Sequence, residues 1–275
     1  MRLTYGHTRA ASYVGYVTQA IVNNLAPLLF VTFERELGLT TADLALLISM
    51  NFLVQIAVDL AAARFADTLG YRAVAAGAHL ISAAGLICLG ILPRALPNPY
   101  VGLITAVALS AVGGGMIEVI ISPIVESLPG DQKAASMSLL HSFYCWGHVA
   151  VVILSTVYFA LFGLGAWPYL AMAWAAVPMV NFLLFLKVPP RTLKEAYAIP
   201  NGRERRLPGL FALFFLLMIC AGAAEQAMSQ WASLFAETGL HVSKTLGDLM
   251  GPCLFAALMG LARVFYGIRG AKLHL

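Results

Sequence analysis

Long apolar runs, each about the length of a membrane-spanning helix, dominate the chain. Windows of about 20 residues with few ionisable side chains can cross a hydrocarbon layer roughly 30 Å thick as helices. The eight windows of this kind are residues 10–33, 44–63, 73–92, 99–125, 135–160, 166–187, 208–231 and 246–268. Turn-forming residues such as Gly70, Pro129-Gly130 and Pro189-Pro190 stand between them. The pattern predicts an all-α integral membrane protein.

The connection at residues 188–207 is longer and more hydrophilic than the others. We interpret it as a linker between an N-terminal six-helix bundle, residues 1–187, and the first two helices of a second bundle, residues 208–275. A shift of 197 residues superposes Gly70-Tyr71-Arg72 on Gly267-Ile268-Arg269. Internal repeats of this kind are common in secondary transporters.

Basic side chains are distributed unevenly over the predicted connections. If the N-terminus is cytoplasmic, only Arg35, Arg94 and Lys244 of the 17 Lys and Arg residues lie outside, and the other 14 lie inside. Because short cytoplasmic loops retain basic residues, this asymmetry predicts a multi-pass protein of the cell membrane with its N-terminus and linker in the cytoplasm.

Composition excludes other classes of protein. The chain is 60% apolar and 11% charged, against roughly 45–50% and about 25% in soluble domains. The net charge of +4 comes from a few short segments, so we expect no nucleic-acid partner. The four cysteines lie within apolar runs without metal-ligand spacing, and we expect no metal and no cofactor.

Polar residues recur at helical spacing inside the predicted spans. Residues four apart share one face of a helix, as Asn51, Gln55 and Asp59 do in the second span. Other such groups are Tyr16, Gln19 and Asn23; Glu118, Ser122 and Glu126; His141, Cys145 and His148; and Glu225, Gln226, Ser229, Gln230 and Trp231. Since polar groups facing lipid are costly, these stripes predict a hydrophilic central cavity.

The two strongest candidates for proton coupling are Glu118 and His141. With a rise of about 1.5 Å per residue, both lie roughly 10 Å to the cytoplasmic side of the midplane, so they can meet. A carboxyl beside an imidazole is a plausible proton-binding pair. Alternatively, Glu118 is a structural hydrogen-bonding acid. We expect Asp59 and Glu126 to lie near the inner boundary and to be interfacial.

Amide, carboxyl and aromatic side chains form the predicted substrate site. Indole rings offer flat apolar faces with hydrogen-bonding edges, which suit a sugar or another polyol. An alternative role for Trp231 is that of a tryptophan at the membrane interface. The triplet Gly113-Gly114-Gly115 indicates close contact between helices and not a substrate site. The predicted substrate-binding residues are Asn23, Gln55, Trp146, His148, Glu225, Gln226, Gln230 and Trp231.

The connection between the second and third spans, from Ala63 to Arg72, resembles the signature loop of the major facilitator superfamily. Asp67, Gly70 and Arg72 match its Asp, Gly and basic positions, whereas Ala63 and Thr68 depart from it. An Asp beside a tight Gly turn can cap a helix end and hold an inner gate shut. The resemblance therefore implies a gating role for Asp67, Gly70 and Arg72.

Glu118, the run Ser136–Gly147 and the run Glu225–Trp231 are similar to the sugar-transporting branch that includes fucose permease. The branch implies alternating access and a proton-coupling acid at Glu118. The first predicted span has no carboxylate to act as its partner, so symport, facilitated diffusion and efflux stay open. Members of the family have twelve helices, so we expect a chain truncated after the eighth.

Secondary active transport of a small polar solute across the lipid bilayer is therefore the leading hypothesis. One alternative is an inactive fragment of a transporter. Another is an intramembrane hydrolase using Glu118, Glu126, His141 and His148, although the H-E-x-x-H and G-x-S-x-G motifs do not occur in the chain.

Overall fold

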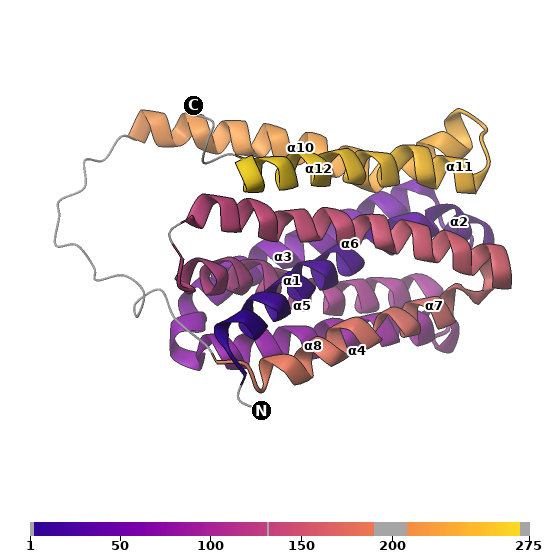
Figure 1. Ribbon diagram of the computed structural model, residues 1–275. Helices are drawn as coiled ribbons and strands as arrows, with labels where there is room; N and C mark the ends of the chain where they lie inside the picture. The colour runs from indigo at the N-terminus through magenta and orange to yellow at the C-terminus, as the bar shows by residue number, and fades with distance from the viewer. Residues whose placement is uncertain (1–2, 131, 190–207, 270–275) are drawn as a thin grey trace.

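A computed structural model describes residues 3–130, 132–189 and 208–269, apart from the side chains of residues 63–68. Within these ranges the regular structure is entirely helical (Figure 1). In chain order the elements are α1 (Tyr5–Asn24), η1 (Pro27–Leu29), α2 (Phe30–Leu37), α3 (Thr41–Leu69), α4 (Tyr71–Ala95), α5 (Pro99–Ser127), α6 (Lys133–Phe162), η2 (Leu164–Ala166), α7 (Trp167–Trp174), α8 (Ala176–Phe185), α10 (Pro208–Gly239), α11 (Lys244–Asp248), η3 (Leu249–Cys253) and α12 (Leu254–Arg269).

Eight segments of the described chain are long and apolar enough to cross a membrane, in agreement with the sequence. Their bounds are Tyr5–Leu37, Thr41–Ala62, Tyr71–Ala95, Pro99–Ser127, Lys133–Phe162, Leu164–Phe185, Pro208–Gly239 and Lys244–Arg269. The all-helical fold class and the expected helical segments are thus confirmed, and most segments extend a few residues beyond the predicted windows.

Three spans are broken where the sequence predicted continuous helices. Proline removes a backbone donor and clashes with the preceding turn, so a helix bends or ends near it. Pro27 begins η1 between α1 and α2, Pro178 follows the junction of α7 and α8, and Pro252 lies within η3, a π-helical turn.

Glycines allow the central helices to pack closely. A Cβ atom at Gly113 of α5 would lie 2.3 Å from Ser82 Oγ of α4. One at Gly114 would lie 3.0 Å from Gln19 Oε1 of α1, and one at Gly115 would lie 3.1 Å from the Gln55 carbonyl oxygen of α3. The glycine triplet is therefore a helix contact, as its sequence suggested, and each glycine faces a different helix.

The bundle has two distinct ends. At the N-terminal end, where α1 begins, Thr8 Oγ1 donates to the Pro189 carbonyl at 2.9 Å. At the opposite end, which holds α2 and α11, Arg94 Nη2 lies 3.6 Å from Glu36 Oε2. Side chains thus tie together connections that are far apart in sequence, at both ends of the bundle.

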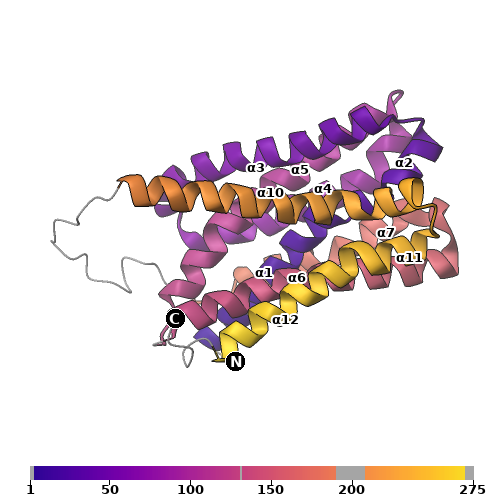
Figure 2. The same ribbon diagram turned by 90° about the horizontal axis from the view of Figure 1, so that it is seen from above.

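The helices after residue 207 contact the first six spans unequally. Figure 2 shows α10 between α3 and α12, with α10 and α12 converging toward α11. Every residue of α10 from Pro208 to Ala224 is exposed, and its buried residues begin at Ser229. In contrast, α12 contacts α6 along its length, from Gly260 near Cys145 to Gly267 near Leu139. Contact between α10 and the first six spans is therefore concentrated toward the opposite end.

The proposed superposition of Gly70 on Gly267 pairs two different conformations. Gly70 has φ +82° and directly precedes α4, a conformation that glycine adopts easily. Gly267 lies inside α12 and faces α6. The tripeptide similarity therefore reflects no shared local structure.

Candidate functional site

A central cavity of about 310 Å³ lies among helices of both the first six spans and the two that follow. Most of its lining residues carry polar groups, as the stripes in the sequence predicted, and its size is at the low end for ligand sites, roughly 300–1,000 Å³. The lining residues are Tyr16, Gln19, Asn23, Phe52, Gln55, Ile56, Asp59, Glu118, His141, Tyr144, Gly222, Glu225, Gln226 and Arg263.

A chain of hydrogen bonds joins the cavity walls of α1, α3 and α5. Gln55 Nε2 donates to Asn23 Oδ1 at 2.9 Å, and Gln19 Nε2 donates to Gln55 Oε1 at 3.1 Å. The same Gln19 nitrogen lies 3.3 Å from Glu118 Oε2 and donates to it. The three amides are buried, whereas Glu118 is exposed to the cavity. The amides thus hold Glu118 in place and leave it accessible to solute or solvent.

Two tyrosines and a histidine complete the wall near Glu118. The rings of Tyr16 and His141 meet edge to face with centroids 5.0 Å apart, and the Tyr16 hydroxyl lies 2.7 Å from Ser122 Oγ. The Tyr144 hydroxyl accepts a hydrogen bond from Asn24 Nδ2 at 3.2 Å. Glu118 and His141 therefore line the same cavity, together with Tyr16.

An ion pair between α10 and α12 forms the facing wall. Arg263 Nη2 lies 3.5 Å from Glu225 Oε2, and the two side chains are 30% and 28% exposed. Arg263 was counted from the sequence only among the cytoplasmic basic residues. The sequence does contain a signal for the cavity position, because Arg263 lies six residues before the end of its span. Charged side chains at membrane depth usually face a cavity and form ion pairs.

Asp59 also differs from its sequence-based interpretation. It lines the cavity, and within the described chain its buried Oδ1 atom has no hydrogen-bond partner. The neighbouring Gly115 explains its depth, since a Cβ atom there would lie 3.2 Å from that oxygen. Glu126, which was expected to be interfacial with Asp59, is half-buried and outside the cavity lining.

The structure divides the predicted substrate-binding residues into two groups. Asn23, Gln55, Glu225 and Gln226 line the cavity. The other four residues, none of which belongs to the described lining, are Trp146, His148, Gln230 and Trp231.

Each residue of the second group has another environment. Gln230 is 3% exposed and donates to the Asn23 carbonyl at 3.2 Å, and Trp231 packs against Phe30 with ring centroids 5.8 Å apart. His148 is buried, and Trp146 packs against Gly260 of α12. A direct contact of these four with a solute stays a prediction.

The predicted gating residues are only partly described. Arg72 Nη2 donates to the Val188 carbonyl at 2.8 Å, which ties the start of α4 to the segment after α8. Gly70 supplies the left-handed turn before α4. The side chain of Asp67 lies outside the described residues, so its gating contact stays a prediction.

The cavity lining carries more acid than base. Asp59, Glu118 and Glu225 face it with Arg263 as the one Lys or Arg among the described lining residues. If all three acids are ionised, the formal sum is three negative charges and one positive. A lining of this sign repels anions and favours uncharged or cationic solutes.

Comparison with known proteins agrees with this architecture. A search of curated proteins finds no match for the chain. The family model described as Major Facilitator Superfamily matches residues 13–273. That range includes all of the cavity lining, from Tyr16 to Arg263. The chain therefore belongs to the major facilitator superfamily of membrane transporters.

Proposed function

We propose that this protein carries a small polar solute, a sugar or a polyol, across the cell membrane by alternating access through the central cavity. The cavity supports this proposal because both sets of helices line it. Sites at such a junction can be exposed to each side in turn when the two sets of helices rock against each other. The N-terminal end faces the cytoplasm in this proposal, following the distribution of basic residues.

The chemistry of the lining favours a hydroxyl-rich solute. Asn23, Gln55 and Gln226 offer amide donors and acceptors, and Tyr16 and Tyr144 offer ring faces. Uncharged polar groups of this kind match the hydroxyls and C–H faces of a sugar. The excess of carboxylates disfavours anionic solutes.

Glu118 is the proposed proton-binding group, with His141 as its neighbour. A carboxyl that faces a cavity while held by an amide can gain and lose a proton without disturbing the packing around it. This arrangement supports a solute–proton symporter. We further propose that the protein uses no metal or cofactor and is not an enzyme.

The cavity lined by both sets of helices is the observation that carries the proposal, and counterflow in proteoliposomes tests it. We expect saturable exchange of at least one labelled monosaccharide or polyol, reduced at least tenfold in Gln55→Leu. Thr105→Ala removes a polar group from an exposed face of α5 and should leave exchange unchanged. Loss of exchange with every sugar and polyol tested would contradict the proposed substrate class and favour a chain that does not transport on its own.

A further inference from the structure

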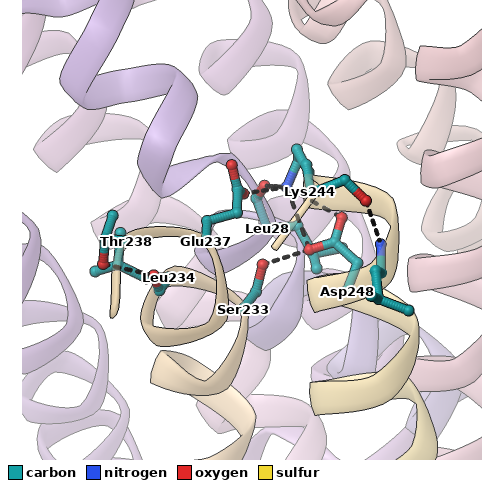
Figure 3. A network of polar contacts seen from close by, with 9 residues as sticks. Leu28, Ser233, Leu234, Glu237, Thr238, Lys244 and Asp248 are labelled. Atoms are coloured by element: carbon teal, nitrogen blue, oxygen red, sulfur yellow. Dashed lines mark hydrogen bonds and ion pairs between the residues drawn. The ribbon is translucent and has the colours of Figure 1, made fainter. Parts of the chain in front are cut away.

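A second cluster of charged side chains (Figure 3) lies around α11, at the opposite end of the bundle (Figure 1), and shares no residue with the lining of the central cavity. Lys244, the first residue of α11, places its Nζ atom 3.0 Å from Asp248 Oδ2 and 3.6 Å from Glu237 Oε1 of α10. Ser233 of α10 donates a short hydrogen bond to Asp248. The four side chains therefore fasten the turn between α10 and α11.

One contact of Lys244 crosses to the first six spans. Its Nζ donates to the Leu28 carbonyl of η1 at 2.6 Å. Pro27 interrupts the first span there, and carbonyls at such breaks lack part of their helical hydrogen bonding. Lys244 therefore uses a carbonyl made available by the break in the first span.

The lysine and its partners are largely shielded from solvent, and Asp248 is buried. The side chains of Lys244, Glu237 and Asp248 are 14%, 8% and 3% exposed. Burying a charge without a partner is costly, but the two carboxylates compensate Lys244 from within α10 and α11. If the contact with Leu28 broke, the ammonium group would still be paired. This arrangement suits a contact that forms and breaks repeatedly.

Side chains of α10 pack on α1 and α2 between this cluster and the central cavity. Gln230 donates to the Asn23 carbonyl, and Trp231 packs on Phe30. The hollow beside them, lined in part by Asn51, measures about 20 Å³, enough for about one water molecule. At the N-terminal end, by contrast, α10 is exposed as far as Ala224.

We propose that Lys244 is a latch that holds the cavity closed at the opposite end through the Leu28 carbonyl. Opening at that end requires the α10–α11 turn to leave η1, so this hydrogen bond must break while the pairs with Glu237 and Asp248 move as a unit. The proposal rests on alternating access, but not on the sugar or on proton coupling.

Cysteine accessibility tests the latch. The native cysteines are first replaced by alanine, and Asn51→Cys is introduced as a reporter. The rate at which a membrane-impermeant maleimide labels this cysteine measures how open the cavity is at the opposite end. We expect Lys244→Met to raise its labelling rate about tenfold, the shift of a two-state equilibrium on losing one charged hydrogen bond. Lys244→Arg keeps a cationic donor and should label close to the wild-type rate.

Two further variants make the result decisive. Arg94→Met removes the ion pair with Glu36 at the same end, but within the first six spans, and it should leave labelling unchanged. Gln226→Cys reports the cavity from the N-terminal end, where labelling should fall as the opposite end opens. The latch proposal would be wrong if Lys244→Met left the labelling rate of Asn51→Cys unchanged, or if Arg94→Met raised that rate equally. It would also be wrong if labelling rose at both reporter cysteines, since that would indicate general loosening of the bundle. Because labelling needs no solute, failure of the sugar assay would leave this test intact.

Discussion

Arg263 on α12 lies 3.5 Å from Glu225 on α10, so the two helices that follow the linker share an ion pair on the wall of the central cavity. The pair joins helices that diverge toward the N-terminal end (Figure 2). It gives the acidic cavity its one described guanidinium.

The Glu225–Arg263 pair should matter more for transport than for stability. Because both side chains are about 30% exposed, we expect Arg263→Gln to cost only about 0.5–1 kcal/mol of stability, while solute exchange falls at least tenfold. Thermal melting in detergent and counterflow measure the two effects. The matched control is Arg269→Gln, which removes another basic side chain of α12, more than one turn further along the helix and outside the cavity lining. Strictly additive effects of Glu225→Gln and Arg263→Gln on exchange would argue against direct coupling.

Glu118→Gln should separate exchange from coupling. The amide keeps the size of the side chain but cannot release a proton, so exchange should survive while accumulation driven by a pH gradient vanishes. Paired counterflow and gradient-driven uptake in the same vesicles measure this. Glu126→Gln changes an acid of the same helix outside the cavity lining and should retain both activities. Gradient-driven accumulation in Glu118→Gln would remove Glu118 from coupling, and equal loss of exchange and stability would indicate a structural acid.

Gly113→Ala should destabilise the bundle by about 1–3 kcal/mol, the usual range for overpacking. The new methyl group would meet Ser82 Oγ at 2.3 Å and the Ser82 backbone nitrogen at 2.6 Å. Gly77→Ala in α4 is the control, because a Cβ atom there meets nothing within 4 Å. It should be neutral or stabilising by up to about 1 kcal/mol, since alanine favours helix. Melting temperatures that fall equally in both variants would contradict the close α4–α5 contact.

Asp67→Asn should slow transport and leave solute binding nearly intact if Asp67 closes the inner gate. The amide retains the shape of the side chain but loses the charge that interacts with helix ends. Initial uptake rates and equilibrium binding by scintillation proximity distinguish the two effects. Arg72→Gln, which loses the donor to the Val188 carbonyl, should act in the same direction. Loss of binding in proportion to rate would exclude a purely gating role.

The N-terminal end should face the cytoplasm. A cysteine introduced at residue 195, in the predicted linker, should resist an impermeant maleimide added outside intact cells, and one at Glu36 should react. Permeabilised cells provide the control, because both positions should then react. The reverse pattern would show that the basic residues do not set the orientation of this protein.

Single-helix patterns accounted for much of the candidate site. Spacings of three and four residues placed Asn23, Gln55, Glu118 and His141 on interior faces, and all four line the cavity. The same patterns could not separate Gln226, in the lining, from Gln230, which lies one turn further along α10 and bonds to the Asn23 carbonyl. Both occupy the same helical face, and only the approach of α1 distinguishes them.

The sequence by itself determined the eight spans, their helical class and their interior faces, because the cost of exposing polar groups to lipid acts on each helix separately. The tertiary structure decided which polar groups meet. Asp59 lies at the cavity because Gly115 lets α3 approach α5, and Arg263 pairs with Glu225 because the bundle places α12 beside α10. Lys244 reaches the Leu28 carbonyl because Pro27 interrupts the first span. Such contacts join residues as many as 216 positions apart, and they depend on how helices pack, which periodicity along a single helix does not encode.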